Sequence, residues 1–259
     1  MSRGSRERFA RVVRDEPVDV AVACLLVGAE VDPELDVDGS LAVLDALAAQ
    51  VRPLVGGTLE HAAEALRVVL GEQAGFAGFE QDYDDVRSSL LHEVLRRARG
   101  LPILLSVVWV EVAQRAGLSA YAMGLPGHVL VAIGKPDGEH VVVDPFSGGR
   151  PAQAPAAFPA MPAVELLTRL LTNVRVLTTR QERSLEAART RLWATELSLL
   201  LPRHPAALRR ERGELLVRLG EHLLGATALE DYAGLVEDAD PQQAEAVRRE
   251  ARQARSRLN

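Results

Sequence analysis

The chain has 259 residues, a net charge of −6 and 47% apolar residues, a composition that supports a globular protein with a sizeable buried core. The negative charge disfavours nucleic acid as a partner, and the single cysteine, Cys24, excludes an intramolecular disulfide and a cysteine-rich zinc site. The first residues are charged, and no apolar run approaches the ~20 residues that span a bilayer. We therefore expect a cytoplasmic protein that does not enter a membrane.

The first hundred residues are expected to be mostly helical, because helix formers dominate and apolar residues recur at helical spacing. The acidic connection 31–40 lacks the spacing and the closing glutamate of a calcium-binding loop, so we assign its carboxylates to a solvated loop. The segment 71–85 is rich in Gly and Phe, which favours a packed loop. Ser88 or an upstream aspartate is expected to cap the helix that follows. Helices are predicted over 4–15, 19–29, 40–51, 58–70 and 88–100.

The stretch 100–150 has a different pattern and predicts a helix followed by a small sheet. A helix is expected over 102–116, and a strand over 118–123 leads into Gly-Leu-Pro-Gly-His. His128 opens a second strand, and a third strand ends at Asp144. A histidine that opens one strand and an aspartate that closes its neighbour stand as a His–Asp catalytic pair requires.

The remainder of the chain is expected to be helical. The Pro- and Ala-rich run 151–162 is the best candidate for a domain boundary. The helices after it are broken by Gly and then Pro, a pattern typical of hairpins stacked as in a tetratricopeptide array. About two repeats are visible where at least three are usual, so we expect this segment to lean on the first domain. Helices are predicted over 162–172, 180–201, 205–219, 221–236 and 241–256, and the repeat pattern is met loosely by Leu216, Leu219, Gly220, Ala228, Tyr232 and Pro241.

Three motifs together resemble the SirB-type transglutaminase-like proteins of bacteria: RRARGLPILLSVVWVEVAQRAGL, YAMGLPGHVLVAI and VVVDPFSGG. The resemblance covers residues 40–250. It implies a transglutaminase-like core, of the papain-like cysteine-protease superfamily, followed by a tetratricopeptide-like segment, and it suggests a regulatory role. His128 matches the family histidine and Asp144 the family aspartate. The family's serine in its Pro-Ile-Ser-Leu-Ser run is Leu104 in this chain, which leaves only Ser106.

The nucleophile of this resemblance is missing. True transglutaminases and their cysteine-protease relatives place a cysteine at the N-terminus of the core helix, where the helix dipole lowers the thiol pKa. Counted back from Gly117, the matching position is Pro102 or its neighbour Ile103, and neither can act as a nucleophile. The chain thus keeps two members of the triad, His128 and Asp144.

Three hypotheses stay open for this site. In the first, it is a degenerate catalytic core kept as a scaffold or binding cleft, with His128 and Asp144 joined by a hydrogen bond. In the second, Ser106, Ser147 or Cys24 supplies the nucleophile of a hydrolase or acyl/amide-transfer enzyme, although Cys24 lies on an apolar helix and is expected to be inert. In the third, the pair performs acid–base chemistry without a covalent step. A metal site is disfavoured because two ligands hold a metal poorly.

The sequence thus predicts a mostly helical α+β protein. We expect N-terminal helices over 1–38, a transglutaminase-like core with a small antiparallel sheet over 39–160, and tetratricopeptide-like hairpins over 161–259. The favoured function is a non-enzymatic, cytoplasmic regulatory or protein-interaction module with a protein or peptide partner. No cofactor and no metal are expected. The sequence specifies neither the oligomeric state nor the partner's identity.

Overall fold

The computed structural model describes residues 3–153, 159–180 and 184–257. The chain forms two compact units, residues 1–170 and 171–259, and the boundary between them falls inside helix α7 (Ala163–Thr179). Residues 1–38 lie in the first unit together with the sheet. The three-part division drawn from the sequence stays a prediction, and its Pro- and Ala-rich connection includes residues 154–158, which lie outside the described residues.

The first unit begins with helices whose starts are set by aspartates. The side chain of Asp19 accepts a hydrogen bond from the backbone N of Val22 at 2.9 Å, and Asp36 accepts one from Gly39 N at 2.8 Å. Such caps satisfy amide groups that have no partner within the helix. The helices of this unit before the sheet are α1 (Arg3–Val12), α2 (Val20–Gly28), α3 (Val37–Val51), α4 (Leu59–Leu66), α5 (Leu91–Arg97) and α6 (Pro102–Arg115).

Two sequence-based expectations about these helices are corrected. The helix predicted over 58–70 is α-helical only to Leu66 and continues as a π-helix, Arg67–Gln73, in which Ala74 N donates to Val69 O. The expected side-chain cap of α5 is absent: its N-cap is Leu90, and the Ser88 hydroxyl instead donates to a buried aspartate. Short 3₁₀ turns complete this region at Arg52–Leu54, Glu80–Asp84 and Val86–Ser89.

The sheet has four antiparallel strands in the order β1-β2-β3-β4. On one face, Tyr121, Met123, Leu130 and Ala132 form a buried cluster. The strands are β1 (Ala120–Leu125), β2 (His128–Gly134), β3 (His140–Asp144) and β4 (Arg150–Pro151), with a 3₁₀ turn, Pro145–Ser147, between the last two. The small antiparallel sheet expected from the sequence is confirmed.

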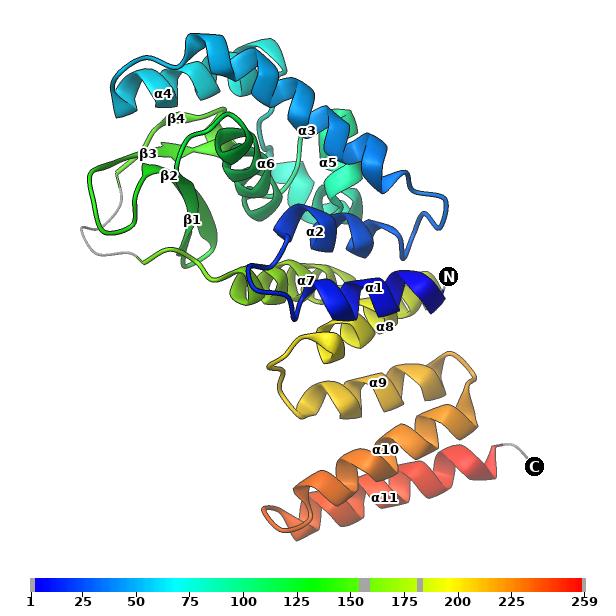
Figure 1. Ribbon diagram of the computed structural model, residues 1–259. Helices are drawn as coiled ribbons and strands as arrows, with labels where there is room; N and C mark the ends of the chain where they lie inside the picture. Colours follow the sequence, from blue (N-terminus) through cyan, green and yellow to red (C-terminus); the bar gives the residue numbers. More distant parts are fainter. Residues whose placement is uncertain (1–2, 154–158, 181–183, 258–259) are drawn as a thin grey trace. The chain divides into compact units, whose positions relative to one another are not determined.

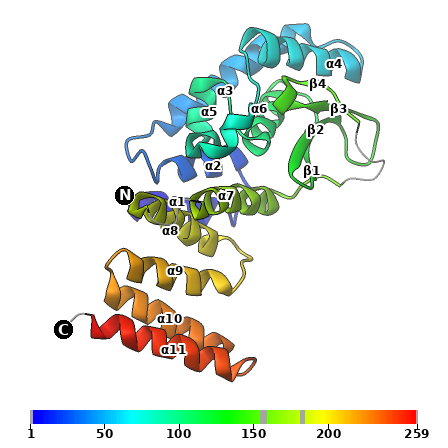
Figure 2. The ribbon, with the colours of Figure 1, turned by 180° about the vertical axis from the view of Figure 1, so that it is seen from behind.

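Helix α6 is the central helix of the first unit. Pro102 occupies its first position, where the missing amide hydrogen costs nothing. It packs against β1 and β2 on one side and against α3 and α5 on the other (Figures 1 and 2). This position explains why most of its residues are apolar: Trp109 and nine other residues from Pro102 to Ala113 are buried.

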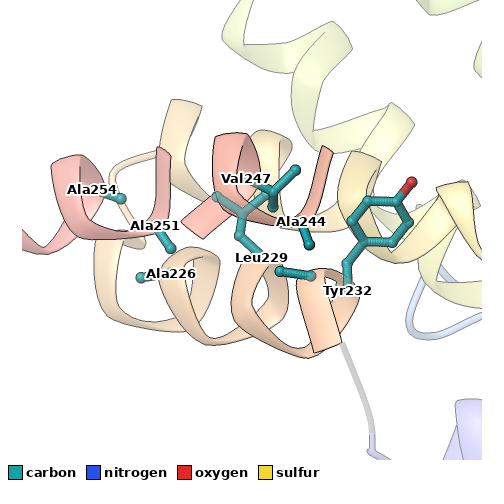
Figure 3. Packing of buried hydrophobic residues seen from close by; sticks show 8 residues of the cluster. Ala226, Leu229, Tyr232, Ala244, Val247, Ala251 and Ala254 are labelled. Atoms are coloured by element: carbon teal, nitrogen blue, oxygen red, sulfur yellow. The ribbon is translucent and has the colours of Figure 1, made fainter. Parts of the chain in front are cut away.

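The second unit contains the end of α7 and four further helices, α8 (Leu185–Leu200), α9 (Ala207–Arg218), α10 (His222–Val236) and α11 (Pro241–Ser256). From α8 onward, each helix packs against the next. Figure 3 shows how small residues of α10 and α11, with Leu229 and Tyr232, fill the space between these two helices. A buried acid on α9, Glu211, pairs with Arg175 of α7 and Arg191 of α8. Within the described ranges, no helix is long and apolar enough to cross a bilayer.

Helix α5 is fitted to α2 through a histidine. A Cβ placed on Gly28 of α2 would lie 2.3 Å from Nδ1 of His92, so glycine makes room for the ring. Burial lowers the pKa of His92, and the neighbouring charges of Glu93 and Asp32 oppose this shift.

This depressed pKa predicts a pH dependence of stability. As pH falls below about 6.5, the unfolded chain binds a proton at this position that the folded chain resists, so stability decreases. His92→Gln is expected to flatten the fall in the free energy of unfolding between about pH 6.5 and pH 5, measured by urea titration. The control His61→Gln alters an exposed histidine of α4 and should leave the slope as it is. An unchanged slope in His92→Gln would contradict the assignment.

Candidate functional site

The two residues singled out in the sequence meet in the structure. Nε2 of His128 lies 3.0 Å from Oδ1 of Asp144. Strand alternation explains the encounter: Ala132 pairs with Val142, and the two residues lie an even number of positions from that pair, so both face the same way. Because a carboxylate only accepts hydrogen bonds, Nε2 carries a proton in this bond, and in the neutral form of the ring Nδ1 is then an acceptor. Among the described residues, no hydrogen bond reaches Nδ1.

Asp144 is the hub of the site. Its Oδ1 also accepts a hydrogen bond from the backbone N of Phe146 at 2.9 Å, and its Oδ2 accepts one from the Ser147 hydroxyl at 2.7 Å. The carboxylate is therefore held from both oxygens while its side chain stays only 18% exposed. His128, at 31%, is the more accessible member of the pair.

Two aromatic rings, those of Phe146 and Tyr83, extend outward from the imidazole of His128. The ring centroid of Phe146 lies 6.0 Å from that of His128, nearly perpendicular to it, and 6.0 Å from that of Tyr83. Tyr83 is half exposed, and burial together with the charge of Asp144 raises the pKa of its hydroxyl. The Phe146 ring therefore connects the imidazole of His128 to the ring of Tyr83.

The start of α6 carries no reactive group. Pro102 and Ile103 are buried, and the backbone N of Leu101, the N-cap, donates to Ser88 O. Pro102 thus stands at the first position of this helix, as the sequence indicated, and its side chain offers neither thiol nor hydroxyl.

None of the three alternative nucleophiles is hydrogen-bonded to His128 among the described residues. The Ser106 hydroxyl is fully buried and donates to Ile103 O at 2.7 Å. Cys24 is buried in α2, and this burial, aided by the charge of Glu111, raises the pKa of its thiol well above the usual range. Ser147 is exposed, but its hydroxyl donates to Asp144.

Comparison with known proteins identifies the family. A family model described as Transglutaminase-like superfamily matches residues 39–177. The chain is 32% identical over 240 residues to a UPF0162 protein of Xylella fastidiosa, a match that covers 83% of this chain and 82% of that protein. This chain belongs to the transglutaminase-like superfamily.

Shorter matches within reach of this family are also found. A UPF0162 protein of Pseudomonas aeruginosa is 30% identical over 150 residues, which is 56% of this chain and 53% of that protein. The human F-box only protein 21 is 31% identical over 68 residues, 26% of this chain and 11% of that protein. Membership in the transglutaminase-like superfamily, suggested by the sequence motifs, is thereby confirmed. The catalytic or binding roles of His128 and Asp144 stay predictions.

The loop that follows Asp144 borders a cavity of about 520 Å³. Phe146, Ser147 and Gly148 line one side of it, and the π-helix lines another. Arg67 is held there by Glu64 and Glu72 through hydrogen bonds of 2.6–2.7 Å. This transglutaminase-like core therefore has an open cavity along the loop that follows Asp144, and neither member of the His–Asp pair lines it. Within the described part of the chain, no three His, Cys, Asp or Glu side chains gather to hold a metal ion.

A second carboxylate, that of Asp82, fixes the segment that carries Tyr83. It is fully buried; Oδ1 accepts hydrogen bonds from Ser88 Oγ and from Arg99 Nε, both at 2.9 Å. Its Oδ2 accepts one from the backbone N of Phe79 at 2.9 Å. Arg99 in turn lies over the Phe79 ring, 5.0 Å from its centroid.

Sequence reasoning missed the parts of this site that come from the segment 71–85. The sequence predicts only a packed loop for that segment, and Phe146 enters the sequence analysis only within the motif VVVDPFSGG. The backbone N of Phe146 donates to Asp144, and its ring lies against Gly78 and Tyr83, which come more than sixty residues earlier in the chain. The aromatic residues of the segment gave a signal for packing but none for the partner.

The Asp82 network predicts a stability effect. Asp82→Asn removes the charge while keeping the shape, which leaves the partly buried Arg99 and Arg97 against a neutral partner. We expect a loss of about 2 kcal/mol in the free energy of unfolding, measured by chemical denaturation. Glu80→Gln, in the same 3₁₀ turn but exposed, serves as the control and should change stability by less than about 0.5 kcal/mol. Equal effects of the two variants would show that the network contributes nothing.

Proposed function

We propose that this chain is a non-catalytic transglutaminase-like protein that acts as a cytoplasmic regulatory or protein-interaction module. The observation that carries the proposal is the lack of a nucleophile beside His128: Pro102 begins α6, and no hydroxyl or thiol of the described residues bonds to the imidazole. A covalent acyl transfer needs a nucleophile within hydrogen-bond reach of its base.

The surroundings of the pair support a binding role. In the neutral form of the ring, Nδ1 of His128 is a hydrogen-bond acceptor that has no partner among the described residues, and His128 is partly exposed. The exposed edge of Tyr83 and the ring of Phe146 add apolar surface beside it. A peptide supplies both matching features, namely backbone N–H donors and apolar side chains. The ligand class that this site suits is thus a protein or peptide segment.

The helices of the second unit extend this proposal. The pairs α8–α9 and α10–α11 have the lengths and short connections of tetratricopeptide-like hairpins, and such arrays present concave surfaces to proteins. The SirB-type resemblance adds a regulatory context. Both elements belong to the proposal and suit a protein partner.

An enzymatic alternative is favoured by one observation. Ser147 is exposed and donates a 2.7 Å hydrogen bond to the same carboxylate that holds His128. A rotation of its side chain would bring the hydroxyl out of this bond, and His128 could then act as its base in a hydrolase or acyl/amide-transfer reaction. Ser106 and Cys24 are poorer candidates because both are fully buried.

Chemical labelling separates the two functions. The folded parent is treated with a fluorophosphonate for serine and iodoacetamide for cysteine, and intact mass and peptide mapping give the modified position. The proposal predicts no adduct on Ser147, Ser106 or Cys24 that depends on His128, and equal labelling of parent and His128→Ala. Cys24 should react only after denaturation, which verifies the reagent, because its thiol is buried. A stoichiometric adduct on Ser147 that disappears in His128→Ala would establish the enzyme instead.

A further inference from the structure

Phe146 contacts both members of the His–Asp pair by different parts of the residue. Its backbone N donates to Oδ1 of Asp144 at 2.9 Å, the same oxygen that bonds to His128. Its ring meets the imidazole edge-on, with an interplanar angle of 86°. The first contact sets the position of the carboxylate, and the second limits rotation of the imidazole about its side-chain bonds.

Phe146 is itself held by Gly78. The backbone N of Gly78 donates to Phe146 O at 2.9 Å. A Cβ placed on Gly78 would lie 1.9 Å from both Cδ2 and Cε2 of the ring, far inside any real contact. The φ of Gly78 lies outside the left-handed region, so its backbone would accept other residues. The ring, and not the backbone, is therefore what requires glycine here.

A second glycine, Gly71, contacts the same loop at Gly148, two residues after Phe146. A Cβ on Gly71 would lie 2.1 Å from the carbonyl oxygen of Gly148. Gly71 belongs to the π-helix, and Gly148 follows the turn that carries Phe146. The segment 71–78 thus meets the loop 145–149 at two points, Gly78 with Phe146 and Gly71 with Gly148.

We propose that Phe146 is a positioning residue for the His128–Asp144 pair and that the space left by the absent side chain of Gly78 keeps its ring in place. Through this contact between Gly78 and Phe146, the segment 71–78 determines which nitrogen of His128 bonds to Asp144 and which is free to bind a ligand. The inference rests on the pair being the working part of the site, as proposed above, and it applies equally to a binding and to an enzymatic site.

The test is Gly78→Ala, with Gly57→Ala as the matched control, since a Cβ at Gly57 meets nothing within 4 Å. The readout is the tautomer of His128 in ¹⁵N NMR of the full chain, alongside circular dichroism and the Tm. The parent and the control should show a single Nε2–H form. Gly78→Ala should displace the ring and lose the single form, giving a mixture of tautomers. A single unchanged tautomer in Gly78→Ala would overturn the proposal.

A double variant removes the remaining ambiguity that Gly78→Ala merely loosens the fold. Phe146→Ala should by itself give the tautomer mixture, and adding Gly78→Ala to it should change the pattern no further, because the ring that the new methyl would strike is gone. Additive effects would mean that Gly78 acts elsewhere. This readout needs no ligand and no activity, so it is independent of the labelling result that decides between a binding module and an enzyme.

Discussion

The hydrogen bonds and ion pairs of the buried Asp82 carboxylate hold together the segments that surround the site. A buried charge is tolerated only where hydrogen bonds and an opposite charge surround it, and Ser88, Arg99 and the amide of Phe79 provide these. The same residues join the turn that carries Tyr83 to the segment that enters α6. Because one buried carboxylate needs these partners, the segment that leads into α6 is held against the turn that carries Tyr83.

The His128–Asp144 pair is held by hydrogen bonds that involve no nucleophile. Asp144 accepts hydrogen bonds on both oxygens, so the carboxylate and the imidazole have structural reasons to persist. Proline at the first position of α6 suits the helix better than cysteine would, because no amide there needs a partner. A helix that begins with proline and a hydrogen-bonded His–Asp pair are therefore compatible in this core.

Much of the core could be predicted from the sequence because its signals are local. The helix after Gly-Leu-Pro, the strands on either side of the polar turn and the meeting of His128 with Asp144 follow from apolar spacing and from strand alternation. The contacts between Gly78 and Phe146 could not be predicted in this way, since nothing in either segment specifies its distant partner. The expected cap at Ser88 was wrong for a related reason: its hydroxyl has a buried anion to satisfy, a long-range demand that overrides the local one.

The π-helix from Arg67 to Gln73 makes the length of this segment as important as its composition. A π turn holds one residue more than an α turn and typically records an insertion into an α-helix. A homologue with one residue fewer before Gly71 would continue α4 as an ordinary helix. Its counterpart of Gly71 would then be turned by about 100° away from Gly148, and the loop behind Asp144 would lose its support. An insertion or deletion in this segment would therefore mark a change in the site.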